Sequence, residues 1–324
     1  MSRRRQGIVA AVLRRIEARL AALTGARAEL LAVQQRLDRL EHGLRESWST
    51  TTEALQRLEH RIARTQQVGG AEIAPLDSVE LRNVLWTLVA EEAENRRRLW
   101  RARADPDYEL AYTEADPLVS ILIPTYDRPA LLAERAVPSG LRQSYRNVEV
   151  VVVGDAAGDE IRQAVASIGD PRVRYHNLTQ RIVASDEPRK HWLVAATMTR
   201  NEALRIARGR WIVSLDDDDE MHESHVERLL ELARERRLEV AYGQLRHLNS
   251  DGSTKDVGEF PPGPGRFAWQ AALYHAGLRF FERELVAAEF NVPGDRFLLE
   301  RMLRAGVRFG MTDEVVCTYF PSQG

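Results

Sequence analysis

This sequence of 324 residues has little cysteine, no long apolar run and no large excess of charge of either sign. Cys317 is the only cysteine, which excludes an intrachain disulfide and a structural zinc site made of cysteines. No run of about 18 apolar residues occurs, so we expect no membrane-spanning helix. Arg14 and Arg15 interrupt the apolar stretch near the N-terminus, which therefore lacks the continuous core of a signal peptide. These features predict a cytoplasmic protein.

The charges nearly balance. Lysine and arginine number 46 against 48 aspartates and glutamates, which gives a net charge of −2. A general nucleic-acid binder would carry a basic excess over a whole domain, so nucleic acid is not expected as a partner.

The first 65 residues place apolar side chains at intervals of seven. One series is almost entirely leucine and isoleucine: Ile16, Leu23, Leu30, Leu37, Leu44, Thr51 and Leu58. A second series, offset by three residues, turns polar at Arg27, Gln34 and Glu41. This spacing predicts a left-handed coiled coil over residues 1–65, through which the chain forms a homo-oligomer. A long amphipathic helix lying on its own domain is the alternative.

Residues 1–20 carry six arginines and one glutamate around apolar positions. A basic amphipathic helix of this composition can lie on an anionic membrane surface, which would place the protein at the inner membrane face. A solvated flank of the coiled coil would have the same composition, so both interpretations stay open.

Residues 66–117 separate the repeat from the rest of the chain. Gly69, Gly70 and Pro75 mark a linker, and Asp77 is placed to cap a helix that ends before Pro106. A polar segment rich in acidic residues then completes this connector. The remaining residues, 118–324, form the main domain.

Short apolar segments alternate with helical segments in the main domain. We expect strands over 119–123, 148–153, 172–176 and 211–215, with helices between them. This alternation predicts an α/β fold with a mainly parallel sheet and helices on both faces. In such sheets ligands bind beyond the carboxyl ends of the strands.

Aspartates follow three of these strands. Asp127 and Asp155 follow the first two, and four consecutive aspartates, 216–219, follow the fourth. An acidic run is usually a solvated loop, but one that directly follows a buried strand favours a divalent cation with oxygen ligands. Asp216 and Asp218 share a face if the segment is extended, and Asp219 joins them if the chain turns there.

Several segments resemble, in consistent order, those of family 2 glycosyltransferases, which have the GT-A fold. The matching segments are Val119–Arg128, Val150–Asp155, Arg200–Leu204, Leu215–Asp219 and Gly294–Arg301. The fourth resembles the family's Asp-x-Asp metal motif, and the last resembles the helix that carries its catalytic base. The resemblance covers roughly residues 118–320 and is more specific than any one motif.

The resemblance implies an inverting transferase that uses a nucleotide-sugar donor and Mn²⁺ or Mg²⁺. It implies a catalytic base at Asp295 and metal ligands at Asp218 and Asp219. It also implies donor contacts from Thr125, Asp127, Asp155, Arg200, Asp216 and Asp217. The acceptor would be a hydroxyl group of a glycan, a lipid-linked saccharide or a small molecule, in the synthesis of a cell-surface glycan.

Two positions depart from the family pattern. Gly154 stands where the family has the first aspartate of a pair, and Gly294 stands where a glutamate commonly precedes the base. These departures keep open a non-catalytic scaffold that binds a nucleotide sugar. A nucleotidyltransferase is disfavoured, because the segment 124–128 replaces the glycine-rich loop typical of those enzymes.

Two further features are candidates for acceptor contact. The loop 258–265 is rich in glycine and proline and could close over a site, and the aromatics Phe267, Trp269 and Tyr274 that follow it could stack on a sugar ring. Trp192 could reach the site in the same way. A surface loop with a core aromatic residue is an equally good interpretation.

Overall fold

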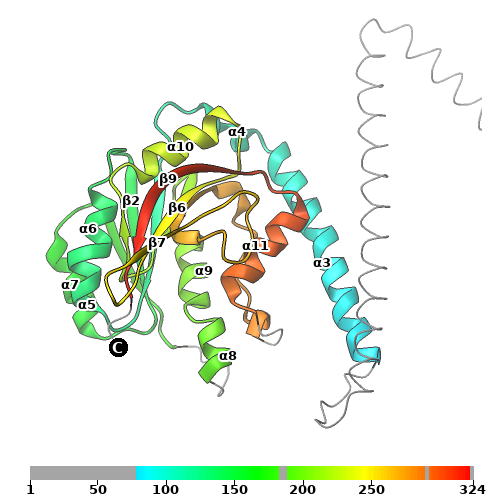
Figure 1. The fold of residues 1–324 in the computed structure, drawn as a ribbon, viewed down its shortest axis with the longest axis horizontal. Helices are drawn as coiled ribbons and strands as arrows, with labels where there is room; N and C mark the ends of the chain where they lie inside the picture. Colours follow the sequence, from blue (N-terminus) through cyan, green and yellow to red (C-terminus); the bar gives the residue numbers. More distant parts are fainter. Residues whose placement is uncertain (1–77, 182–187, 289–291, 322–324) are drawn as a thin grey trace, which may run out of the picture. The chain divides into compact units, whose positions relative to one another are not determined.

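The computed structural model describes residues 78–181, 188–288 and 292–321, with side chains from residue 91 onward (Figure 1). The chain divides into two compact units, residues 1–76 and 77–324, and the described residues belong to the second unit. The predicted coiled coil, the basic segment 1–20 and the glycines of the linker lie outside the described residues. Across the part that is described, no helix is long and apolar enough to cross a membrane.

Two helices precede the sheet, where the sequence predicted one helix and a polar connector. The first is α3 (Ser78–Ala104), which ends before Pro106 as expected. The second is α4 (Pro106–Thr113), which lies within the segment that the sequence predicted as a polar connector. Asp105 caps α4 by accepting a hydrogen bond of 2.9 Å from the Asp107 amide, and proline is well suited to a first helical turn. The acidic character of this segment therefore marks a helix start.

The main domain contains a nine-stranded sheet with the order β3-β2-β1-β4-β8-β6-β9-β5, and β7 pairs with β6. The strands are β1 (Val119–Thr125), β2 (Val148–Gly154), β3 (Val173–Asn177), β4 (Trp211–Ser214), β5 (Glu220–Met221), β6 (Val240–Leu248), β7 (Thr254–Val257), β8 (Ala272–His275) and β9 (Phe309–Tyr319). The four predicted strands are β1 to β4.

The sheet is mixed, and the expectation of a mainly parallel sheet holds only for its first half. Strands β3, β2, β1 and β4 run parallel, whereas β8 runs antiparallel to both β4 and β6. The reversal arises because β6 and β7 form a hairpin through a tight turn at residues 249–253. Gly252 adopts a φ of +83° there, which favours glycine.

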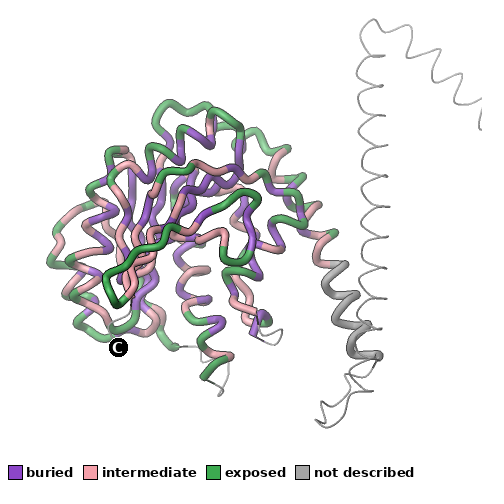
Figure 2. The backbone as a smooth tube through the Cα atoms, viewed as in Figure 1, coloured by how far each residue is buried: buried purple, intermediate pink, exposed green. Residues whose placement is uncertain are grey.

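Helices cover both faces of the sheet, as predicted. They are α5 (Pro129–Leu131), the π-helix η1 (Leu132–Ala136), α6 (Val137–Leu141), α7 (Asp159–Ile168), α8 (Pro188–Leu193), α9 (Thr197–Ile206), α10 (His225–Glu235) and α11 (Gly294–Ala305). Three short 3₁₀ turns are η2 (Trp269–Ala271), η3 (Ala276–Leu278) and η4 (Leu285–Ala288). Neighbouring strand residues face opposite sides: Ile121 packs in the core with α7 and α10, and Leu122 in the core with α9 and α11. Strands β1, β2 and β4 are buried along their whole length, whereas β7 is exposed and drawn mostly in green in Figure 2.

A buried glutamate ties the two N-terminal helices to the sheet. Glu239 directly precedes β6 and is fully buried. It accepts two hydrogen bonds from Arg103 of α3, at 2.6 and 2.7 Å, and one of 2.6 Å from the Tyr108 hydroxyl of α4. The Arg308 amide donates a fourth at 2.8 Å. This network fixes α3 and α4 against the strand ends opposite the candidate site.

Candidate active site

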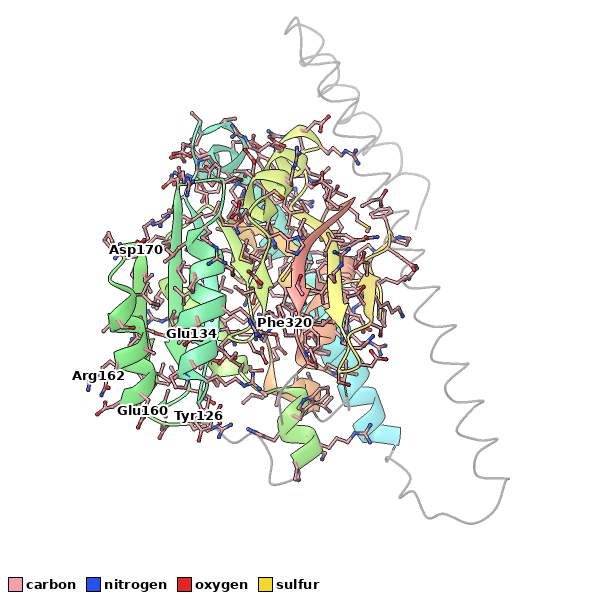
Figure 3. All side chains as sticks on the ribbon, turned by 60° about the vertical axis from the view of Figure 1, so that its left-hand side comes forward. Tyr126, Glu134, Glu160, Arg162, Asp170 and Phe320 are labelled. Carbon is pink, nitrogen blue, oxygen red and sulfur yellow. The ribbon has the colours of Figure 1, made fainter. Side chains whose placement is uncertain are left out.

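A cavity of about 680 Å³ lies at the carboxyl ends of β1, β2 and β4. Figure 3 shows this edge: Tyr126, which follows β1, and Asp170, which precedes β3, lie at opposite ends of the strands. In the parallel register Thr125 lies beside Gly154, and the Asp155 amide donates a hydrogen bond of 2.9 Å to the Thr125 carbonyl. The residues that follow β1 and β2 therefore emerge together.

Eight of the nine predicted site residues line this cavity. They are Thr125, Asp127, Asp155, Arg200, Asp216, Asp217, Asp218 and Asp295. The ninth, Asp219, does not line it and is fully buried behind the wall. The prediction that ligands bind at the carboxyl edge therefore leads to one cavity, built from residues up to 170 positions apart in the sequence.

One arginine pairs with two buried carboxylates of the acidic run, Asp217 and Asp218. Arg128 reaches Asp218 at 2.7 Å and Asp217 at 3.2 Å, and Asp217 also accepts a hydrogen bond of 2.7 Å from the Thr125 hydroxyl. Arg135 donates to the main-chain oxygen of Asp218 at 2.7 Å. Arg128 thus bridges two carboxylates at the mouth of the predicted metal site.

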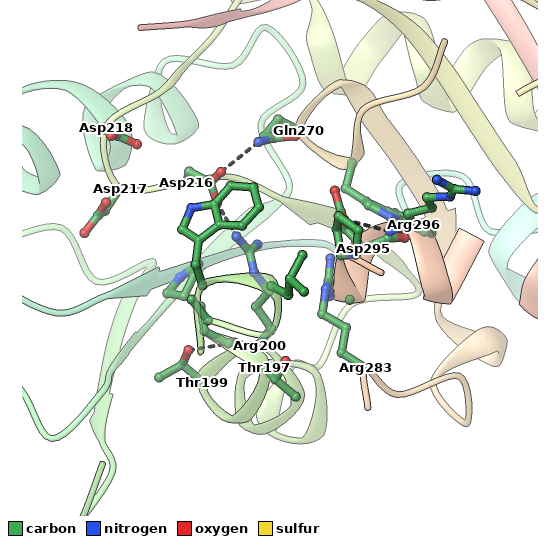
Figure 4. Close-up of a pocket in the computed structure, with 18 of the residues that line it drawn as sticks. Thr197, Thr199, Arg200, Asp216, Asp217, Asp218, Gln270, Arg283, Asp295 and Arg296 are labelled. Atoms are coloured by element: carbon green, nitrogen blue, oxygen red, sulfur yellow. Dashed lines mark hydrogen bonds and ion pairs between the residues drawn. The ribbon is translucent and has the colours of Figure 1, made fainter. Parts of the chain in front are cut away.

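Asp216 is held by a separate set of donors (Figure 4). Arg200 forms an ion pair with one of its oxygens, and Gln270 donates to the other at 2.7 Å. Burial would raise the pKa of Asp216, but Arg200 and Gln270 outweigh it and lower that pKa. Asp216 is therefore a carboxylate, and Arg200 is fixed further by a hydrogen bond of 2.8 Å to the Ser214 hydroxyl.

The rest of the run is short of positive charge. Burial raises the pKa values of Asp217 and Asp218 despite the nearby Arg128. Burial and the charge of Asp216 raise the pKa of Asp219 to about 8. One Asp219 oxygen accepts a hydrogen bond of 3.1 Å from the Phe320 amide, and the other has no hydrogen-bond partner among the described residues. An orphaned buried carboxylate oxygen beside two further carboxylates fits a cation in this region.

The carboxylates are not drawn together into a closed ligand set. Within the described ranges, no group of three or more His, Cys, Asp or Glu side chains converges closely enough to hold a metal ion. Three carboxylates of the run line the cavity, Asp216, Asp217 and Asp218, so a cation bound there would meet these side chains.

The departure at Gly154 has a steric cause. A Cβ atom at this position would lie 2.8 Å from the Tyr175 hydroxyl and closer still to the Asn177 side chain. Asn177 occupies this space because its amide donates to the Ala157 carbonyl and its oxygen accepts from the Ala157 amide, both at 2.9 Å. Asp155 remains and pairs with Arg181 at 3.1 Å.

Asp295 lies in the first turn of α11 with its side chain exposed to the cavity. One of its oxygens accepts a hydrogen bond of 2.7 Å from the Arg296 amide, and its main-chain oxygen accepts one of 2.9 Å from the Trp269 indole. A Cβ atom on Gly294 would be in ordinary van der Waals contact with Leu193, Thr197 and Val194, at 3.6 to 4.0 Å, so no close contact explains the second departure.

Gln270 of η2 and Arg283, which follows η3, also form the cavity wall and were not predicted, because their side chains carried no sequence signal for a site. Trp269 of η2, a candidate from sequence, lines the cavity. Trp192, a candidate from sequence, lines the cavity with 70% of its surface exposed. Residues 263–265 of the proline-rich loop line it as well.

Among known protein families, the model described as "Glycosyl transferase family 2" matches residues 120–290 of this chain. WcaA of Escherichia coli K12, named for colanic acid biosynthesis, is 37% identical over 108 residues, which cover 32% of this chain and 34% of WcaA. ExoO of Rhizobium meliloti, a succinoglycan biosynthesis protein, is 34% identical over 136 residues, covering 42% of this chain and 35% of ExoO.

A third relative is named for its reaction. WfgD of Escherichia coli, a UDP-Glc:α-D-GlcNAc-diphosphoundecaprenol β-1,3-glucosyltransferase, is 28% identical over 163 residues, covering 50% of this chain and 58% of WfgD. The matches therefore span between about a third and three fifths of these relatives. Among solved structures, residues 1–349 of Staphylococcus aureus TarS in complex with UDP match with a TM-score of 0.50 and 18% identity, covering 62% of this chain and 60% of that one. At this identity the match shows the fold.

Proposed function

The chain belongs to glycosyl transferase family 2, and from this premise we infer that it is an inverting, metal-dependent glycosyltransferase. It would move a sugar from a nucleoside-diphosphate donor to a hydroxyl group. The observation that carries this proposal is the convergence of Asp155, Asp216, Asp218 and Asp295 on one cavity. Asp155, Asp216 and Asp218 would bind the donor, and Asp295 would act as the base at the part of the cavity that receives the acceptor.

The donor half is proposed to extend from Asp155 to the acidic run. Thr125 and Asp127 would line the nucleoside, and Asp155 would accept a hydrogen bond from the base. TarS was solved with UDP and WfgD is named for a UDP-sugar donor, so uridine diphosphate is the first ligand to test.

Asp218 and Asp216 are the residues proposed to hold Mn²⁺ or Mg²⁺. Such a cation stabilises the negative charge that develops on a leaving diphosphate. Arg128 and Arg200 are placed to orient the diphosphate, because both guanidinium groups already lie against these carboxylates.

Asp295 is proposed to remove the proton of the acceptor hydroxyl. A sugar hydroxyl is a weak nucleophile, and a fixed carboxylate that takes its proton lowers the barrier to attack. The Trp269 indole and the Arg296 amide hold Asp295 in place. A single displacement assisted by this base would invert the configuration at the transferred carbon.

A thermal-shift experiment tests the donor site. We expect UDP to raise the melting temperature of the protein, and Mn²⁺ to increase that shift, because a ligand that binds only the folded state stabilises it. Asp218→Asn should remove the part of the shift that depends on Mn²⁺, and Asp251→Asn, in the exposed β6–β7 turn, is the matched control. If no nucleoside diphosphate shifts the melting temperature with or without Mn²⁺, donor binding is contradicted.

The relatives' names guide the proposal for the acceptor and for the N-terminal region. WcaA, ExoO and WfgD are named for polysaccharides or a lipid-linked saccharide, so we propose an acceptor of a cell-surface glycan at the inner membrane face. Residues 1–65 would join copies of the chain, and residues 1–20 would contact the membrane. Deleting residues 1–70 should lower the molar mass of the assembly in light scattering and leave the UDP shift unchanged. An unchanged stoichiometry would contradict the coiled coil.

A further inference from the structure

Arg283 stands apart from the other arginines of the cavity. Four of them pair with carboxylates: Arg128 with Asp218, Arg181 with Asp155, Arg200 with Asp216, and Arg296 with Glu300. The guanidinium group of Arg283 makes no hydrogen bond or ion pair with any residue in the described ranges. It is half-buried and its charge lies near that of Arg200, and the nearby charges of Asp295 and Asp216 offset this only in part, so a further anion would stabilise it.

The position of Arg283 is nevertheless closely fixed. Its amide donates a hydrogen bond of 2.9 Å to the Asn201 side chain, and the Asn201 side-chain amide donates one of 2.8 Å to its carbonyl. Its guanidinium lies over the Trp269 ring, 5.7 Å from the ring centre. A cation that is held this firmly, with its donors unused by the protein, has the properties of a preorganised anion site.

The same contacts place Arg283 beside Asp295. Trp269 contacts Arg283 through its ring and holds the main chain of Asp295 through its indole N–H, so one side chain positions both residues. Figure 4 shows Arg283 directed toward Asp295. Burial and the charge of Arg200 lower the pKa of Arg283 to about 10, while the charge of Asp295 acts in the opposite direction. At neutral pH Arg283 is still a cation.

Arg283, Gly294 and Asp295 all line the cavity, so a ligand bound there can reach both side chains. Gly294 adjoins Asp295 and has no side chain. No carboxylate therefore projects from position 294 that would repel an anion. The cations Arg128 and Arg200 serve the acidic run at the donor end, whereas Arg283 shares its support with the base.

We propose that Arg283 binds a negatively charged group of the acceptor, a carboxylate or a phosphate close to the hydroxyl group that is glycosylated. This inference rests on the proposed function, because it takes Asp295 as the mark of the acceptor end. It adds a substrate class: acceptors that carry an oxyanion are selected over neutral saccharides.

Three probes of similar size test this selection. Methyl glucoside is neutral, methyl glucuronide carries a carboxylate, and glucosyl phosphate carries a phosphate. Their binding to the full-length protein is measured by saturation-transfer NMR titration in the presence of UDP and Mn²⁺. We expect at least one anionic probe to bind roughly tenfold or more tightly than the glucoside, the range typical of hydrogen bonds to charged groups. Whichever anionic probe binds more tightly identifies the group.

Variants connect the preference to Arg283. Arg283→Gln should reduce the affinity for the preferred anionic probe roughly tenfold or more and leave that for the glucoside unchanged. Arg283→Lys, which keeps the charge, should restore part of the preference. Arg205→Gln is the control, because Arg205 is exposed, pairs with Glu202 on α9 and does not line the cavity. The melting temperature of each variant confirms that it folds.

The outcomes separate this inference from the proposed function. Equal affinity for the three probes, no binding of any of them at millimolar concentration, or a preference that survives Arg283→Gln would overturn it while UDP still binds. A loss of UDP affinity in Arg283→Gln with an unchanged probe preference would assign Arg283 to the donor and overturn it as well. Failure of UDP to bind the wild-type protein would remove the proposed function, and this inference with it.

Discussion

Glu239 and Asp219 are both fully buried carboxylates, and they lie in opposite electrostatic surroundings. Glu239 accepts hydrogen bonds from Arg103, Tyr108 and the Arg308 amide. Burial alone would raise its pKa, but these donors lower it below the usual value of a glutamate. Asp219 has the Phe320 amide as its donor, and burial together with Asp216 raises its pKa to about 8.

The difference in hydrogen-bond donors indicates that Glu239 stabilises the fold, whereas the acidic run is suited to binding a ligand. A buried carboxylate with a full set of donors ties neighbouring elements together, as Glu239 ties α3 and α4 to β6. A buried acidic run with too few donors lowers the stability of the free protein, and a ligand that supplies positive charge would restore it. The two ends of the strands therefore carry an anchored acid and an unsatisfied one.

The largest effect is expected from Asp295, the exposed acid in the first turn of α11. Asp295→Asn keeps the size of the side chain and removes the proton acceptor, so we expect sugar transfer to fall by about 10²- to 10⁴-fold. UDP affinity should stay unchanged, because the proposal assigns Asp295 to the acceptor and not to the donor. The rate is measured as UDP release with an acceptor panel, and Glu300→Gln on the same helix is the control. Full turnover in Asp295→Asn would remove this residue as the base.

The anchored acid should behave in the opposite way. Glu239→Gln leaves Arg103 and the Tyr108 hydroxyl without a charged acceptor, so the free energy of unfolding should fall by about 2–4 kcal/mol. The UDP shift should persist, because Glu239 lies at the other end of the strands. Urea denaturation measures the stability. Glu114→Gln, which breaks the exposed pair with Arg210, should change it by about 1 kcal/mol or less. Equal losses in both variants would contradict the anchoring role.

The strands that carry the site could be predicted from the sequence, because their signals lie in short stretches of neighbouring residues. Strands β1, β2 and β4 are buried on both faces, so they appear as continuous apolar runs, and the aspartates that follow them mark the carboxyl edge. The helix α4 was missed because the acidic residues of its first turn resemble a linker. The short strand β8 was missed because four residues carry no detectable period.

The residues of the site that belong to sequence motifs were predicted, and the others were not. Eight predicted residues meet in one cavity, but alternation along the chain could not show that the turn after Asp218 directs Asp219 inward. Gln270 and Arg283 come from irregular segments far along the chain, and only tertiary packing brings them to Asp216 and Asp295. The reason for Gly154 was equally hidden, since it depends on Asn177 of the neighbouring strand.

The smallest effect, and the most direct test of the contrast, concerns the pH dependence of stability. An aspartate has an ordinary pKa of about 3.9 when unfolded, and that of Asp219 is about 8 in the folded protein. Between these values the folded state binds more protons than the unfolded state, so this residue makes stability fall as pH rises.

The variant Asp219→Asn keeps the shape of the side chain and cannot ionise. In EDTA the free energy of unfolding of the variant, relative to that of the wild type, should therefore rise by about 1 kcal/mol for each pH unit from about pH 5 to pH 8. Urea denaturation across that range measures the gain, and a constant difference between the two proteins would show that the Asp219 carboxyl group has the same pKa in the folded and unfolded states. The Mn²⁺-dependent UDP shift of the same variant reports whether Asp219 also holds the metal, as the sequence predicted. A shift equal to that of the wild type would leave Asp218 and Asp216 as the ligands, which is what their exposure to the cavity favours.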